Sequence, residues 1–406
     1  MDTQNTPIHI KLWHHDFWRL CFANLLLTTS VYMLLVGIPN MMFNEGYSAL
    51  QVGVALGAYG VGIFLLGGFC SYWVQRYRRN HVCQLAIFGL AASIVILFYL
   101  NEFWDIKSDY WACIVARLVM GACMGVAQIT LSSTLVIDTC ESFQRTEANY
   151  ITSWFSRLAV AAGPLLSVIV GDWAGFKYVF PLAALLALAS LALVSLVKFP
   201  FKAPTEHMPV FSTDRFFLPQ GLPLFINIVI IMSVVGMMLT LPHSLDFYLM
   251  LLCGLFLGIL AEKYVFPDAD LKSEVITGLL LLGGALLVRV SGQLVAIEFI
   301  MPSMVGLAIG IIGSRFLLFY IKLAKHCQRG TSVSSFFLAW ELGISLGLFL
   351  GFGLLDRANH GQFSVTSPKL DAVSPLLIYV ELSFVVVAFV LYNFVIHRWY
   401  MKHRNR

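Results

Sequence analysis

The sequence predicts an all-α integral membrane protein with twelve transmembrane helices, arranged as two pseudo-symmetric six-helix bundles. Hydrophobic residues make up 59% of the 406 residues, charged residues make up only 12%, and the mean hydropathy is +0.81. In soluble globular domains about 25% of the residues are charged. Apolar runs of roughly 20 residues, enough for an α-helix to cross about 30 Å of hydrocarbon, recur along the whole chain. A β-barrel would instead show alternation over about 10 residues per strand, which the sequence lacks.

Twelve apolar segments are long enough to span a membrane. They cover approximately residues 17–39, 49–73, 82–100, 111–135, 149–170, 175–197, 222–241, 246–266, 274–291, 293–321, 332–354 and 374–396. The connections are shortest near residues 242–246 and 289–293, and the span count depends on these two breaks. An even number of spans places both termini on the same side of the membrane.

The two halves of the chain share a pattern at an offset of 184 residues. The pairs at this offset are Gln144 and Gln328, Arg145 and Arg329, Gly163 and Gly347, and Arg157 and Glu341. The spacing of Gly121 and Gly125 also recurs, in Gly306 and Gly310. A glycine pair, a charged turn and a following glycine in the same order indicate a duplicated helix-turn-helix unit. The halves therefore carry opposite charges at equivalent depths.

The positive charges indicate the orientation of the chain. Eighteen lysines and arginines fall on one side of the predicted spans and five on the other, which places both termini in the cytoplasm. The predicted parts are a cytoplasmic leader (1–16), a six-helix bundle (17–197), a proline-containing linker (198–221), a second bundle (222–396) and a cytoplasmic tail (397–406). Segments outside the spans are too short for a soluble catalytic domain of even about 50 residues.

Three ionisable residues within the spans are the main candidates for the functional site. Glu341 lies about 9 residues, or roughly 13 Å, into its span and so near the midplane. A charge in hydrocarbon costs on the order of 3 kcal/mol and persists where it faces a partner or a wet cavity. We expect Glu341 to bind and release a proton, with Arg157 and Arg117 as its charge partners. The alternative is a permanent ion pair that sets helix packing.

Both arginines have other possible roles. Arg157 can anchor an anionic group of a solute, and Arg117 can extend to the lipid headgroups. Side chains of suitable size and polarity to bind a solute are Asn24, Tyr32, Gln128, Trp154, Asn227 and Arg315. For Arg315, extension to the headgroups near Lys322 is the competing interpretation. The eight cysteines contain no C-x-x-C spacing, the histidines are isolated from other ligands and no Walker loop is present, so we expect no metal and no cofactor.

Local motifs resemble those of the major facilitator superfamily. Residues 71–80, SYWVQRYRRN, are similar to the family's loop G-x-x-x-D-R-x-G-R-R, with Arg76 and Arg79 matching and the aspartate replaced by Gln75. Asp138 resembles the acidic residue that family members set near these arginines.

Two further motifs fall in the fourth and fifth spans. Arg117 followed by Gly121 is similar to the arginine and glycines of proton-coupled members. Gly163-Pro164 matches the centre of the glycine-rich motif of export-type members, although Ser167-Val168 replaces its usual glycine pair.

This resemblance implies two bundles that rock about a midplane site and open it alternately to either side. It also implies that the first, fourth, seventh and tenth spans line the cavity, and that the second, fifth, eighth and eleventh join the halves. The gating residues that it implies are Arg76, Arg79, Asp138, Gly163 and Pro164.

The function predicted from these features is secondary active transport of a small organic solute, with proton-coupled efflux as the leading form. A solute/proton symporter is the alternative within this class. A membrane-embedded enzyme acting on a lipid-linked substrate and a non-transporting sensor or scaffold are alternatives from other classes; the leading prediction is not an enzyme. The expected partners are a small-molecule substrate, protons and the lipid bilayer, with no nucleic acid. We expect a monomer in the cell inner membrane.

Overall fold

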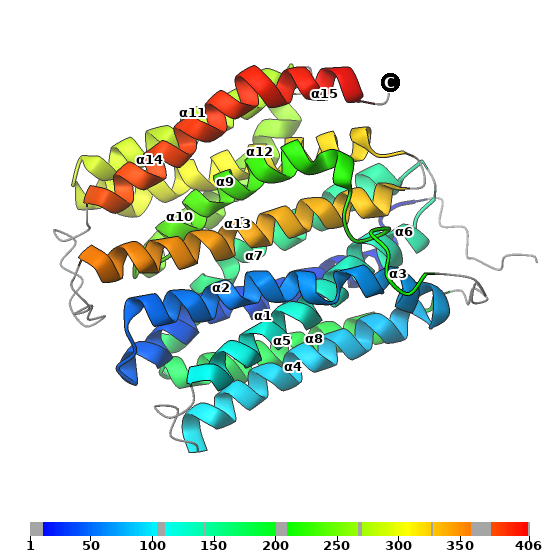
Figure 1. The fold of residues 1–406 in the computed structure, drawn as a ribbon, viewed down its shortest axis with the longest axis horizontal. Coiled ribbons are helices and arrows are strands. Elements are labelled where there is room, and N and C mark those ends of the chain that lie inside the picture. Colours follow the sequence, from blue (N-terminus) through cyan, green and yellow to red (C-terminus); the bar gives the residue numbers. More distant parts are fainter. Residues whose placement is uncertain are drawn as a thin grey trace, which may run out of the picture.

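A computed structural model describes residues 11–103, 110–141, 143–199, 209–266, 270–325, 328–358 and 375–404 of the chain. Helices account for nearly all of these residues (Figure 1). Among them, eleven helical segments are long and apolar enough to cross a membrane, and a pair bent by 43° supplies a twelfth. Each of the twelve predicted spans therefore has a helical counterpart, and the breaks near residues 242–246 and 289–293 are both present.

The N-terminal half contains the helices of the first six spans. They are α1 (His15–Asn44), α2 (Ala49–Leu65), α3 (Gly67–Arg76), α4 (Arg79–Phe103), α5 (Tyr110–Thr130), η2 (Leu131–Leu135), α6 (Val136–Asp138), α7 (Arg145–Trp173), η3 (Phe176–Tyr178) and α8 (Val179–Ser195). The α2/α3 pair is the bent span. The π-helical segment η2 interrupts the fourth span at its serines and threonine, a feature frequent at functional sites.

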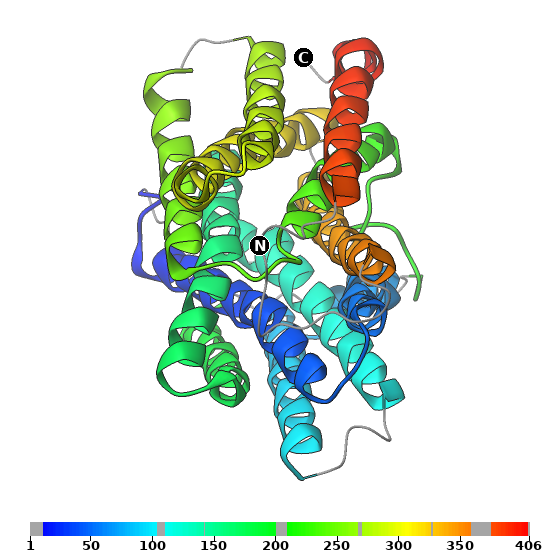
Figure 2. The same cartoon turned by 90° about the vertical axis from the view of Figure 1, so that its left-hand side faces the viewer.

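The C-terminal half contains the other six spans. They are η4 (Pro219–Gly221), α9 (Leu222–Met238), α10 (Leu245–Tyr264), α11 (Leu271–Val290), η5 (Ala296–Ile300), α12 (Met301–Leu323), α13 (Arg329–Ala358), α14 (Pro375–Val390), η8 (Leu391–Ile396) and α15 (His397–His403). In Figure 1 this half lies above the N-terminal half, and Figure 2 shows both groups of helices viewed along the bundle.

Packing is densest within each half. In the N-terminal half α1 packs on α7 and α8, and α2 on α5; in the C-terminal half α9 packs on α13, and α10 on α12. The halves meet mainly where α2 contacts α13 and where α7 contacts α10. In Figure 1, α2 and α13 run side by side through the middle of the molecule. The contacts between the halves thus lie on few helices.

The sequence repeat corresponds to equivalent contacts in the two halves. A Cβ atom at Gly121 would clash with the carbonyl oxygen of Tyr59 in α2, and one at Gly306 would clash with that of Leu251 in α10. Small residues at these positions let the paired helices approach to backbone contact. The α5/α2 pair and the α12/α10 pair are therefore structural counterparts.

The start of α1 and several other helix ends lie at the same end of the bundle. This end of the bundle is here called the terminal face. The His14 ring contacts the Thr139 carbonyl oxygen (Nε2 to O 3.1 Å), and Gln220 Nε2 donates to the Leu323 carbonyl oxygen at 3.2 Å. The C-terminal helix α15 ends at this face too (Figure 1). The other end, with the α1/α2 and α9/α10 turns, is called the opposite face.

The described part of the predicted linker crosses from one half to the other at the terminal face. The backbone N–H of Ser212 donates to the carbonyl oxygen of Gly68 in α3 (2.9 Å), and that of Leu218 donates to Ser335 Oγ in α13 (2.7 Å). Arg215, at a φ of 59°, donates from its side chain to Thr134 and from its backbone to Thr331. Residues 200–208 of the linker and 1–10 of the leader lie outside the described residues.

Candidate functional site

Glu341 lies on α13 and is bonded to the other half of the protein. Its side chain is buried, and its two carboxylate oxygens accept hydrogen bonds from Tyr32 of α1 (2.8 Å) and Tyr59 of α2 (3.3 Å). Within the described part of the chain, its carboxylate forms no ion pair within 4.0 Å. Two neutral phenols from the opposite bundle are thus the direct partners of this carboxylate.

Arg117 on α5 lies next to Tyr59, one of the two tyrosines that bond to Glu341. Its guanidinium carbon lies 4.9 Å from the centre of the Tyr59 ring, a cation–π arrangement. The side chain is fully buried, its Nη1 contacts Met120 Sδ at 3.8 Å, and its Nε and Nη2 atoms have no hydrogen-bond partner among the described residues. A buried guanidinium without a carboxylate in contact is costly. Arg117 therefore points inward to Tyr59 and does not extend to the headgroups.

Arg157 on α7 also bonds to the other half, but not to Glu341. Its Nη1 donates to the Gly310 carbonyl oxygen (3.0 Å) and to Ser314 Oγ (2.8 Å), both on α12. Its guanidinium carbon lies 4.0 Å from the centre of the Trp154 ring, and Nη2 has no partner among the described residues. Arg157 therefore keeps an unused donor next to the boundary between the halves.

A small polar cavity of about 30 Å³ lies beside Arg157. Its lining includes Asn24, Gln128, Ser132, Asn149, Ser153, Ser156, Arg157, Val333, Phe336, Phe337 and Trp340. Several polar atoms here are buried without a described partner, including Asn24 Oδ1, Gln128 Oε1 and Asn149 Oδ1. The volume admits about one water molecule. A solute therefore needs this cavity to widen before it can bind.

Of the predicted solute-binding residues, Asn24 and Gln128 line this cavity, whereas Tyr32 bonds to Glu341. Trp154 lies under the Arg157 guanidinium and packs against Gly258 and Gly310 of the other half. Asn227 bonds to the Ala388 carbonyl oxygen (3.0 Å) and so joins α9 to α14. Arg315 forms an ion pair with Glu274 that joins α12 to α11.

Three of the predicted gating residues lie at helix ends near the terminal face. Arg79 and Asp138 form an ion pair between the start of α4 and the end of α6, with 17% and 18% of their side chains exposed. Arg76 lies over the Tyr72 ring, with its guanidinium carbon 5.7 Å from the ring centre.

Gly163 and Pro164 are buried inside α7. A Cβ atom at Gly163 would lie 2.5 Å from Tyr32 Cβ. Because Tyr32 is the closer donor to Glu341, the Gly-Pro segment packs directly behind the Glu341 site.

Sequence reasoning missed several residues of the site. Tyr59 and Ser314 stand out, because they are the direct partners of Glu341 and Arg157 across the boundary. Their positions next to glycines were a usable signal, because glycines mark close helix approach. Tyr59 precedes Gly60 and Gly62 in α2, and Ser314 follows Gly310 by one helical turn. Two further contacts were also missed: Tyr150 bonds to Glu262 between α7 and α10 in a partly buried contact, and the buried Arg289 donates to Glu381 at 2.8 Å.

Comparisons with known proteins agree with this architecture. Residues 20–348 match the sequence model of the Major Facilitator Superfamily. No curated protein matches the sequence. Similar solved structures include a bacterial homologue of the human lysosomal transporter Spinster, in an inward-facing and unoccupied conformation, with 16% identity, a TM-score of 0.67 and coverage of 96% of this chain and 98% of that one.

Two further structures show the same fold. The human organic anion transporter MFSD10 (TETRAN) has 15% identity and a TM-score of 0.66, with coverage of 93% of this chain and 98% of that one. A bacterial homologue of the iron transporter ferroportin in an outward-facing state has 14% identity and a TM-score of 0.63, covering 95% and 99% of the two chains. The matched family model covers most of the chain, and these structures align along nearly all of it. This chain is a multi-pass membrane protein that belongs to the Major Facilitator Superfamily of transporters.

Proposed function

We propose that this protein is a secondary active transporter that moves a small organic solute by alternating access, with Glu341 as the group that couples transport to protons. The observation that supports this most is the contact of the buried Glu341 carboxylate with two tyrosine hydroxyls of the other half. Any motion that separates α13 from α1 and α2 must break these bonds. Protonation of Glu341 and movement of the halves are then linked.

The physical basis of this link is the cost of a buried charge. A carboxylate that loses its hydrogen-bond donors in a low-dielectric site is strongly destabilised as an anion. In the conformation described here, Tyr32 and Tyr59 stabilise the ionised form directly, and Arg117 acts on it through the Tyr59 ring. In a conformation that takes Glu341 away from both hydroxyls but keeps it out of water, Glu341 takes up a proton; when the bonds to the hydroxyls form again, it releases one. One proton is exchanged in each cycle.

The proposed solute site is the polar cavity beside Arg157. Its unpartnered donors and acceptors, among them Arg157 Nη2 and Gln128 Oε1, are available to a solute once the cavity widens. Arg157 bonds to α12 across the boundary, so a solute that engages it also affects the contact between the halves. Solute binding and rocking are coupled in this way.

We further propose that transport is outward, in exchange for protons, with both termini in the cytoplasm of a cell with an inner membrane. Support for export comes from Gly163-Pro164, which lies behind Tyr32 in α7. Gating at the terminal face is assigned to the Arg79–Asp138 ion pair together with Arg76. The same proposal includes the division of the chain into a leader, two bundles, a linker and a tail. It also includes a monomeric state.

The test is untargeted mass spectrometry of the compounds that inside-out vesicles accumulate under an imposed proton gradient. Glu341→Gln and the matched control Glu298→Gln are compared with wild type; Glu298 is a partly exposed carboxylate in η5 outside this site. Accumulation by wild type and by the control, lost with Glu341→Gln and with an uncoupler, supports proton-coupled efflux.

Other outcomes of the same experiment separate the alternatives. Accumulation that is independent of the gradient contradicts proton coupling and leaves Glu341 a structural role. Accumulation only in right-side-out vesicles, with the same dependence on Glu341, supports the solute/proton symporter instead.

A further inference from the structure

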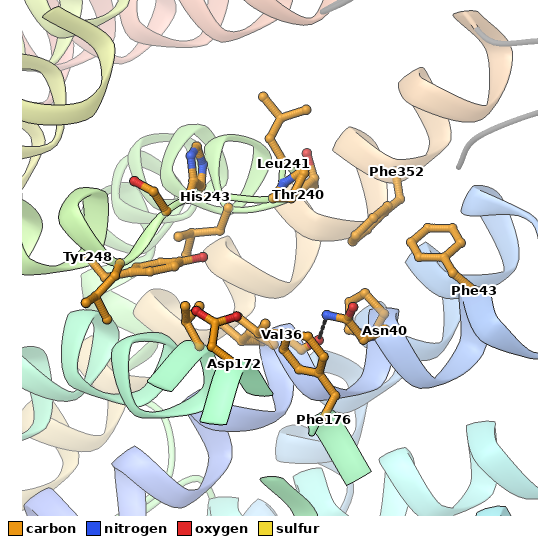
Figure 3. A pocket seen from close by; sticks show the side chains of 17 residues that line it. Val36, Asn40, Phe43, Asp172, Phe176, Thr240, Leu241, His243, Tyr248 and Phe352 are labelled. Carbon is orange, nitrogen blue, oxygen red and sulfur yellow. Dashed lines mark hydrogen bonds between the residues drawn. The ribbon is translucent and has the colours of Figure 1, made fainter. Parts of the chain in front are cut away.

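A second cavity, of about 380 Å³, lies between the halves at the opposite face, away from Glu341 and Arg157. Figure 3 shows residues of both halves around it, with Asn40, Phe43, Asp172 and Phe176 from the N-terminal half. Thr240, His243, Tyr248 and Phe352 contribute from the C-terminal half. Its volume is in the range of small-molecule sites, about 300–1,000 Å³.

The walls of this cavity are mostly aromatic and apolar. Phe43, Phe176, Tyr248 and Phe352 come from four different elements and lie around the same space in Figure 3. Aromatic rings supply apolar contact, and their faces attract cations. The walls therefore suit a ligand with an apolar body and a positive charge.

The charge of the cavity is negative. Asp172 is the one acidic or basic residue, histidine apart, among the described lining residues, and its carboxylate projects toward the cavity in Figure 3. No ion pair of Asp172 is present within the described ranges, and the nearby Lys177 instead pairs with Glu102 (3.8 Å). The carboxylate is thus available to a ligand.

His243 does not offset this charge. Burial is the main cause that lowers the pKa of His243 to about 4, so the imidazole is neutral at physiological pH. Its ring stacks on Phe247, with 3.6 Å between the ring centres, and its Nε2 donates to the Met238 carbonyl oxygen at 2.8 Å. The histidine is therefore held as a neutral part of the wall.

Helix ends add to the negative potential. α1, α7 and α9 end at Asn44, Trp173 and Met238, and the cavity is lined by residues in or next to these last turns. The C-terminal end of a helix carries a partial negative charge that favours cations within about one turn. Two helices begin at the same place, α8 through η3 and α10, so three C-terminal ends lie at the cavity against two N-terminal ends.

From this arrangement we infer that the cavity between the halves at the opposite face binds an organic cation that carries an aromatic or similarly apolar group. Asp172 is the anionic partner, and Phe43, Phe176, Tyr248 and Phe352 enclose the apolar group. The inference does not depend on the direction or proton coupling of transport, because binding here needs only this cavity. An occupant touches both halves, so closure of this face requires its release or its movement inward.

Binding to the purified full-length protein tests this by calorimetry with two probes, trimethylphenylammonium and benzenesulfonate. They share a phenyl ring and differ in the sign of the charge. We expect the cation to bind at least tenfold more tightly than the anion. Asp172→Asn should weaken cation binding about tenfold, whereas Asp246→Asn should leave it unchanged, because Asp246 is exposed at the same face but does not line the cavity.

The aromatic part of the site is tested with Phe176→Leu, which should weaken binding of both probes. Equal binding of the two probes, tighter binding of benzenesulfonate, or cation binding unaffected by Asp172→Asn would overturn the inference. These are equilibrium binding measurements, so they do not depend on the outcome of the vesicle transport experiment. Failure of the cation-binding inference can therefore be distinguished from failure of the proposed transport function.

Discussion

Arg157 and Glu341 occupy equivalent positions in the two halves, and each bonds to the half to which it does not belong. Arg157 on α7 donates to Gly310 and Ser314 of α12, and Glu341 on α13 accepts from Tyr32 and Tyr59 of α1 and α2. Each is followed six residues later by a glycine that packs on the first helix of its own half. The duplicated unit therefore joins the halves twice, once through a cation and once through an anion.

The first prediction concerns the two tyrosines. Tyr32→Phe should reduce proton flux per solute transported more than Tyr59→Phe, because the Tyr32 bond is 2.8 Å long and the Tyr59 bond is 3.3 Å long. A hydrogen bond to a charged group contributes about 1.5–3 kcal/mol, which is tenfold or more in an equilibrium constant. The measurement is proton and solute flux in proteoliposomes, with the exposed Tyr379→Phe as control. Wild-type coupling in both variants would count against the assignment.

The second prediction concerns the repeated glycines. Gly121→Ala and Gly306→Ala should each lower stability by about 1–3 kcal/mol, because the added methyl group clashes with a carbonyl oxygen of the adjacent helix. Gly353→Ala is the matched control, since its Cβ atom would be 3.6 Å from Leu50 Cδ1, an ordinary contact. Thermal unfolding in detergent gives the comparison. If all three variants melt alike, the close helix approach is not needed.

The third prediction is a pH dependence of stability that arises from His243. Its pKa is about 4 in the folded protein against an ordinary value of 6.5, so the unfolded chain binds the proton more readily. Stability from this group is therefore complete above about pH 6.5 and declines as pH falls toward 4, by about 3 kcal/mol.

The substitution His243→Gln removes the titrating imidazole and should flatten the decline. Unfolding midpoints between pH 4 and 7 test this, with the exposed His81→Gln as control. An unchanged pH profile in His243→Gln would show that other groups cause the decline.

The fourth prediction concerns the ion pair at the terminal face. Arg79 and Asp138 both lie in the N-terminal half, and Asp138 ends the fourth span, whose Ser133 packs against Gly330 of α13 in the other half. Breaking the ion pair with Arg79→Gln or Asp138→Asn should loosen this end of the span and so favour separation of the halves there, with an effect of about 1 kcal/mol because the pair is partly exposed. Val333 of α13 lines the small polar cavity beside Arg157, so in a variant whose eight native cysteines are replaced, a Val333→Cys thiol reports this opening by its labelling rate. In the charge-reversed pair Arg79→Asp/Asp138→Arg, we expect the labelling rate of the thiol to return to its original low value. Equal labelling rates in all variants would exclude a gating role for this ion pair.

Much of the fold could be predicted from the sequence. The apolar runs alone specify helices and their approximate ends, because span length follows from membrane thickness. The repeat identified Arg157 and Glu341 as equivalent positions, because the two halves of the sequence keep the same spacing between these residues and the glycines that follow them. The structure confirms the twelve spans and the fold class.

The partners of the charged residues could not be predicted, because helix rotation decides them. Tyr59 lies 282 residues from Glu341 in the chain, and Ser314 lies 157 residues from Arg157. For Asn227 and Arg315, the sequence indicated their depth in the membrane but not their direction. Both turn toward helices of their own half, where Ala388 and Glu274 are their partners.

The most direct test of proton coupling is infrared difference spectroscopy of the purified protein after a pH jump across the range in which transport depends on pH. A carbonyl band of protonated carboxyl groups should appear as pH falls in wild type and in Glu298→Gln, and the component of this band that arises from Glu341 should be missing in Glu341→Gln. A difference spectrum of Glu341→Gln identical to that of wild type would contradict the role of Glu341 as the proton-binding group.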